Sequence, residues 1–260
     1  MAGAEPLEGL LKHQDTVEGR LYDLLLVAFI SFCSFTASAL IARQFLPTTI
    51  AHRVPSTIHA IVVCAFSVWV LTSDHEFAFM REFQAMLRGE GPVDFVTGHS
   101  EFLETVVGIT DGYFAVDFFL MIIDGELSTV YFIHHIVGGI VFSMAVVLST
   151  CEAHVAFLLT TELSTPFLNV MLSSEAGTKT HLASAVCFAV TFMAIRVVPV
   201  PLYMYALYQT LGFFEGNTTT PIKWVSIISI LIPPVLNVVW GGEIIRQAVA
   251  MLCPGKDKKS

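Results

Sequence analysis

Charged residues are scarce in this chain of 260 residues: Asp, Glu, Lys and Arg make up 13% of it, whereas hydrophobic residues make up 55%. A soluble domain carries about 25% charged residues, so the composition excludes a soluble globular class. The mean hydropathy of +0.72 indicates the same. No polar linker is long enough to separate two domains, and we therefore expect one polytopic membrane domain.

Positive charge is the scarcer sign, with 13 Lys and Arg against 22 Asp and Glu and a net charge of −9. This balance excludes nucleic acid as a partner and electrostatic attachment to anionic lipid. The five cysteines show no CxxC pairing, and no HExxH or similar metal-ligand spacing is present. We expect no metal and no cofactor.

Long apolar runs occur seven times, each far longer than a strand. About 20 apolar residues cross a bilayer, and a lone span must satisfy its own backbone, so these runs predict helices. The expected fold class is all-α, a polytopic transmembrane helical bundle of about seven spans. The expected spans are residues 21–45, 54–73, 102–123, 127–149, 153–173, 181–211 and 224–252.

Three parts of the chain follow from these spans: an extramembrane segment at 1–20, the membrane domain at 21–252 and a basic tail at 253–260. Residues 74–100 are polar and predict an extramembrane loop with a short helix. Proline interrupts the later spans at Pro166, at Pro199 and Pro201, and at 233–234, where we expect breaks or kinks.

Two adjacent histidines, His134 and His135, lie within a charge-free run. A polar group in a span usually faces a partner or a wet cavity. The short connection at 124–126 makes the third and fourth spans an antiparallel hairpin, which places Asp117 and both histidines at matched depth. Because successive helical residues point about 100° apart, one ring is expected to line a cavity and the other to pair across helices, and plain interhelical hydrogen bonds for both are the alternative.

The fifth and sixth spans bring further polar groups into the membrane. Glu162 lies near the bilayer centre and requires a cation, a proton or water. Arg196, flanked by apolar residues, is the expected cation, with Glu162 or Asp117 as its carboxylate. The remaining members of the expected polar network are His59, Asn169 and Asn237. For His59 and Asn237 we expect contacts between helices, and a role as ligands is the alternative.

In this order and spacing, the polar groups resemble the TLC domain family, which includes ceramide synthases, translocation-associated membrane proteins and small TLC-domain proteins of lipid homeostasis. The matching stretches are Arg53-x-x-Ser56-Thr57-x-His59-Ala60, Gly112-Tyr113-Phe114-x-x-Asp117, His134-His135, Glu162-Leu163-Ser164-Thr165-Pro166-Phe167-x-Asn169, Arg196 and Asn237-Val238-x-Trp240. The resemblance is strongest to the small stand-alone members.

The resemblance implies a core of six helices around a lipid-accessible cavity, with one further helix. It also implies that His134 and His135 would be the catalytic residues if the chain were an enzyme. Ceramide synthases carry a second motif, His-Asp-x-x-Asp, on the next helix, where this chain has Glu162-Leu163-Ser164-Thr165-Pro166. We therefore expect binding or sensing of a membrane lipid without catalysis. The alternatives are acyl-CoA-dependent N-acyl transfer and an accessory structural subunit of a larger membrane complex with membrane-protein partners.

Two features of the sequence bear on location. Asn217 begins the glycosylation sequon Asn217-Thr218-Thr219, and the last five residues have the form of a dilysine retrieval signal, with a solvated basic end as the alternative interpretation. Both fit an endomembrane protein of the endoplasmic reticulum. An organellar membrane, with the chain in a complex, is the alternative.

Overall fold

The computed structural model describes residues 16–73, 79–90, 99–125, 128–213 and 220–252. Among these residues the regular elements are all helical, and each expected span coincides with a helix or with helices in series. In chain order they are α2 (Val17–Phe45), α3 (Thr48–Ala51), α4 (Arg53–Ser73), α5 (Phe79–Arg88), α6 (Glu101–Asp124), α7 (Thr129–Val147), α8 (Glu152–Thr160), η1 (Thr161–Ser164), α9 (Thr165–Ser173), α10 (Lys179–Phe192), η2 (Met193–Val197), α11 (Val200–Phe213) and α12 (Thr220–Leu252).

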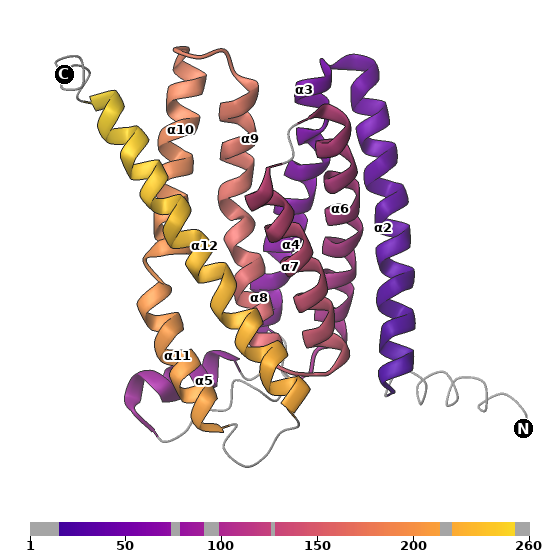
Figure 1. Ribbon diagram of the computed structural model, residues 1–260, viewed down its shortest axis with the longest axis vertical. Helices are drawn as coiled ribbons and strands as arrows, with labels where there is room; N and C mark the ends of the chain where they lie inside the picture. The colour runs from indigo at the N-terminus through magenta and orange to yellow at the C-terminus, as the bar shows by residue number, and fades with distance from the viewer. Residues whose placement is uncertain (1–15, 74–78, 91–98, 126–127, 214–219, 253–260) are drawn as a thin grey trace, which may run out of the picture.

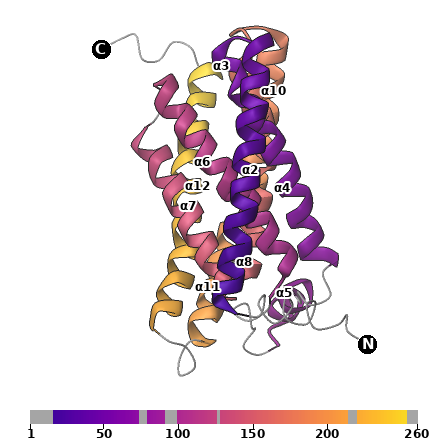
Figure 2. The same cartoon turned by 90° about the vertical axis from the view of Figure 1, so that its right-hand side faces the viewer.

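Membrane-spanning character is clear for five segments of the described chain, which are long and apolar enough to cross a bilayer. These are Val17–Phe45, Thr48–Ser73, Glu101–Asp124, Glu152–Ser173 and Lys179–Gln209, and Tyr131–Val147 is a shorter apolar helix. The long helices run side by side as a bundle, with α2 at its edge and α12 crossing it obliquely (Figures 1 and 2). The predicted helical membrane bundle is confirmed.

The helix ends follow local sequence signals. Thr16, Ser100 and Ser128 cap α2, α6 and α7, since each side-chain oxygen accepts a hydrogen bond from the backbone N–H three residues later. Gly125 closes α6 in the left-handed conformation, with φ of 70°, which glycine adopts without strain. Gly125 at the end of α6 and Ser128 at the start of α7 together allow α7 to run back alongside α6.

Two of the three spans expected to break or kink at proline do break, in each case just before the proline. Ahead of Pro166, the 3₁₀ turn η1 separates α8 from α9. Ahead of Pro199, the π turn η2 separates α10 from α11, and the N–H of Val198 bonds to the carbonyl of Met193 at 2.9 Å. Because Pro199 lacks an N–H and its ring crowds the carbonyl four residues earlier, the helix widens before it. In contrast, α12 continues as one helix through Pro233 and Pro234, and a kink there stays a prediction.

Close packing of α2 against α6 depends on glycine. A Cβ atom added at Gly112 would lie 2.4 Å from the carbonyl oxygen of Ala28 and 2.7 Å from the backbone nitrogen of Phe32. Both neighbours are backbone atoms, which cannot move aside without shifting α2.

We therefore expect Gly112→Ala to lower the free energy of unfolding by about 1–3 kcal/mol through overpacking. The matched control is Gly242→Ala, because nothing lies within 4 Å of a Cβ added there, and it should be neutral or slightly stabilising. Thermal unfolding of both variants in the same detergent measures the difference. Equal melting temperatures for the two variants would contradict the close approach of α2 and α6.

Candidate functional site

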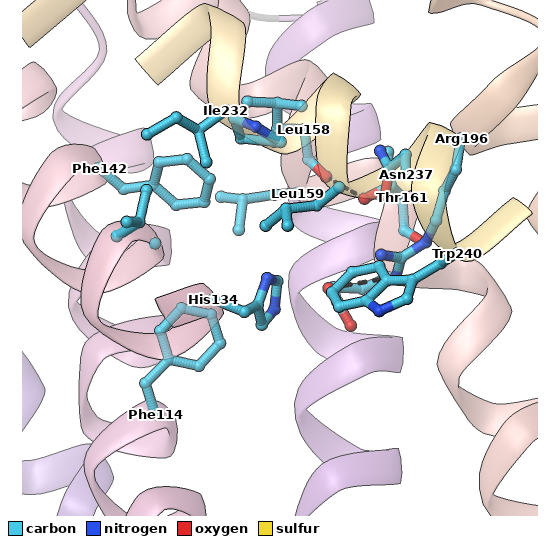
Figure 3. Close-up of a pocket in the computed structure, with 15 residues that line it drawn as sticks. Phe114, His134, Phe142, Leu158, Leu159, Thr161, Arg196, Ile232, Asn237 and Trp240 are labelled. Atoms are coloured by element: carbon cyan, nitrogen blue, oxygen red, sulfur yellow. Dashed lines mark hydrogen bonds and ion pairs between the residues drawn. The ribbon is translucent and has the colours of Figure 1, made fainter. Parts of the chain in front are cut away.

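A small cavity lies in the middle of the bundle, where α12 crosses α7, α8, η1 and η2 (Figure 3). Its volume is about 30 Å³, which is room for one or two water molecules. Most of its wall is apolar, and a few polar side chains enter it. The lining residues are Phe114, His134, Val137, Gly138, Phe142, Leu158, Leu159, Thr161, Glu162, Arg196, Ile232, Pro233, Leu236, Asn237 and Trp240.

The predicted ion pair between Arg196 and Glu162 forms one wall of the cavity and is confirmed. The guanidinium Nη2 lies 3.4 Å from the Glu162 carboxylate oxygen Oε1, and Nε donates to the Thr161 carbonyl at 2.9 Å and to the Ser164 hydroxyl at 3.1 Å. The other carboxylate oxygen accepts from the Thr165 hydroxyl at 2.7 Å. The π turn carries the guanidinium, and the 3₁₀ turn carries most of its partners, so both irregular turns serve this contact.

The predicted contact between Asp117 and one of the two histidines is also confirmed, and the partner is His135. Its Nε2 lies 2.8 Å from the Asp117 carboxylate, and its Nδ1 lies 2.9 Å from the carbonyl of Tyr131. A carbonyl oxygen only accepts, so Nδ1 donates there, and Nε2 and the carboxylate share a proton. The pair joins α6 to α7 and lies outside the cavity lining.

His134 points away from this pair and into the cavity, because successive residues on a helix point about 100° apart (Figure 3). Its ring meets the Trp240 ring edge-on at 5.5 Å between centroids and lies 5.8 Å from that of Phe114. The two imidazoles therefore point as expected, since one faces a cavity and the other pairs across helices.

The other expected polar residues are divided between cavity and helix contacts. Asn237 lines the cavity. Asn169 instead donates to the hydroxyls of Ser56 and Thr57, each at 3.0 Å, and joins α9 to α4. His59 stacks on Tyr113 at 4.0 Å between centroids and joins α4 to α6, away from the lining. The sequon at Asn217 falls outside the described residues.

A row of carboxylates along α6 was missed by the sequence reasoning apart from Asp117. Glu104, Asp111, Asp117 and Asp124 recur at intervals of six or seven residues, and this spacing was the available signal. Asp111 accepts a hydrogen bond from the Ser143 hydroxyl on α7. Asp124 binds Arg43 at 3.1 Å and lies 3.3 Å from His52. The row fastens α6 to its neighbours along its length.

A second missed cluster surrounds His99, just before α6. Its Nδ1 lies 2.9 Å from the buried carboxylate of Glu152 on α8, and its Nε2 lies 3.7 Å from the carboxylate of Glu104, which in turn faces Arg20 of α2. The hydrogen bond to Glu152 raises the pKa of the His99 imidazole above its ordinary value of 6.5, although burial acts in the opposite direction.

This raised pKa predicts a pH-dependent contribution to stability. Because the folded-state pKa lies above the unfolded one, the contact stabilises the fold below the ordinary pKa and is lost as pH rises through the folded value. We expect the melting temperature of the wild type, relative to that of His99→Gln, to fall as the pH rises above the ordinary imidazole pKa of about 6.5. A difference that stays constant as the pH rises would show that His99 does not titrate against Glu152.

Comparison with known proteins finds the TLC domain over residues 49–246, which includes every lining residue of the cavity. TLC domain-containing protein 4-B of Danio rerio is 26% identical over 204 residues, which are 75% of this chain and 71% of that protein. A putative TLC domain-containing protein, L438, of Acanthamoeba polyphaga mimivirus is 30% identical over 138 residues, which are 51% of this chain and 64% of that protein. No solved structure matches. A domain match over most of the length, on a helical membrane bundle, places the chain in the TLC domain family.

Proposed function

We propose that this protein binds a membrane lipid, with the polar group of the lipid in the cavity beside His134. The observation that carries the proposal is the lining: an imidazole, an amide and an indole meet a buried ion pair inside an otherwise apolar wall. A few convergent polar groups in an apolar wall are the arrangement by which proteins orient the polar part of a bound small molecule. Lipid is the small molecule that surrounds a membrane bundle.

The cavity volume of about 30 Å³ accepts only a small polar group. The alkyl chains of the lipid must therefore lie between helices or along their outer faces. The surface of the bundle offers large exposed apolar side chains for this, among them Tyr131 on α7 and Val239 on α12. We propose a binding role in lipid homeostasis for such a site, and we propose the endoplasmic reticulum as its membrane on the sequence grounds given above.

Acyl transfer is the second candidate, and the position of His134 favours it, because an imidazole that faces a cavity is suited to act as a general base. The Glu162 carboxylate, in contrast, is fully engaged by Arg196 and Thr165. It therefore offers no second acid or base beside the imidazole, and for this reason binding is the function that the geometry supports best.

The test is mass spectrometry of lipids retained by the purified full-length protein. We expect a lipid enriched over the bulk extract in the wild type and depleted in His134→Ala. The matched control is His181→Ala, since His181 lies at the start of α10 and outside the cavity lining. The same preparations, incubated with long-chain acyl-CoA and a sphingoid base, should yield no N-acyl product. Turnover that His134→Ala abolishes would replace binding by catalysis, and equal lipid retention by all three proteins would refute the site.

A further inference from the structure

The charged groups of the cavity neutralise each other. Arg196 is 8% exposed, and the hydrogen bonds of its guanidinium go to Glu162, Thr161 and Ser164. Both oxygens of the Glu162 carboxylate are likewise engaged. The pair carries no net charge, and neither member offers an uncompensated charge to an incoming ligand.

Three uncharged polar groups also face the cavity, and they have no hydrogen-bond partner among the described residues. They are the imidazole of His134, the side-chain amide of Asn237 and the indole of Trp240. Figure 3 shows the three side chains around one space, and its dashed contacts belong to Thr161 and to the ion pair. The amide offers donors and an acceptor, the indole offers one donor, and a neutral imidazole offers one of each.

Resting on the proposed lipid site, we infer that the lipid group bound there is uncharged: a hydroxyl together with an ester or amide carbonyl, and not a phosphate or an ammonium. A hydroxyl donates and accepts, and a carbonyl accepts, so both match the three unpartnered groups. A phosphate would bring its charge into a low-dielectric site whose only described cation is already paired, and the desolvation of that charge would go uncompensated. The small cavity volume also favours a hydroxyl over a phosphate.

The experiment compares two lipids that differ only in this group. Purified, delipidated full-length protein is titrated in detergent with dioleoylglycerol or with dioleoyl phosphatidic acid, and bound lipid is counted by native mass spectrometry. We expect dioleoylglycerol to bind at least about tenfold more tightly, as the loss of one or two hydrogen bonds and an unpaired charge predicts.

Two conservative variants assign the preference to the cavity. Trp240→Phe keeps an aromatic ring but removes the indole N–H, and Asn237→Leu keeps a side chain of similar size but removes the amide. Each should weaken dioleoylglycerol binding by about fivefold to tenfold, the effect of one lost hydrogen bond. The matched control is Trp69→Phe, since Trp69 is 48% exposed on α4, and it should leave binding unchanged. The melting temperature of each variant is measured, and binding is compared only among variants whose melting temperature equals that of the wild type.

The outcomes separate this inference from the function beneath it. Tighter binding of phosphatidic acid, weakened by Trp240→Phe or Asn237→Leu, would overturn the uncharged ligand and leave the lipid site in place. Dioleoylglycerol binding that neither variant changes would also overturn the inference, because the unpartnered groups would not be the ligands. Failure of both lipids to bind, together with no lipid retained on purification, would overturn the lipid site itself.

Discussion

Arg196→Gln is expected to lower the free energy of unfolding by about 3–5 kcal/mol, the usual effect of removing one partner from a buried ion pair. The substitution leaves the Glu162 carboxylate, whose side chain is 15% exposed, without its cation in the membrane interior. It also removes the hydrogen bonds that Arg196 donates to the Thr161 carbonyl and the Ser164 hydroxyl. Unfolding in mild detergent, monitored by circular dichroism against added denaturant, measures the loss.

The double variant Glu162→Gln with Arg196→Gln should be milder than Arg196→Gln alone, because both charges then disappear together. The four proteins form a double-mutant cycle whose coupling energy reports the pair directly. The matched control cycle uses Glu243 and Arg246 on α12, an ion pair at 2.6 Å whose side chains are 46% and 70% exposed, for which little coupling is expected. Strict additivity at Glu162 and Arg196 would mean that the two groups are not coupled.

Asp117→Ala is expected to destabilise the protein by about 1–3 kcal/mol, because it leaves the Nε2 of the buried His135 ring without its partner. The contact it removes, 2.8 Å long, joins α6 to α7 in the membrane interior. Glu90→Ala is the comparison, since the Glu90 side chain is 55% exposed in its pair with Arg88. Melting temperatures lowered equally by the two substitutions would count against a structural role for the Asp117–His135 pair.

Depth in the membrane could be predicted from the sequence, and direction around a helix could not. Asp117 and His135 meet because the connection between α6 and α7 is short and fixes the register of the hairpin, so counting residues from the turn sufficed. Glu162 and Arg196 meet because a buried carboxylate and a buried guanidinium each require the other. In both cases chemistry and depth left few partners to choose from.

The positions of His59 and Asn169 around their helices could not be predicted from depth. His59 stacks on Tyr113, the kind of interhelical contact expected for it, and Asn169 binds Ser56 and Thr57, so both side chains lie away from the cavity. Which face of a helix turns inward depends on packing, for example on Gly112 where α2 approaches α6. The prolines predict a break in this span, but they do not predict that the break takes the form of a π turn that carries Arg196.

If the cavity beside His134 holds the polar group of a lipid, that lipid should remain bound through purification. The most direct measurement is the mass spectrum of lipids retained by the purified wild type and by Trp240→Phe, with Trp69→Phe as control. We expect one enriched lipid class, which bears a hydroxyl or carbonyl group and no phosphate, and which is depleted only in Trp240→Phe. Retained lipid that matches the bulk membrane in all three proteins would contradict it.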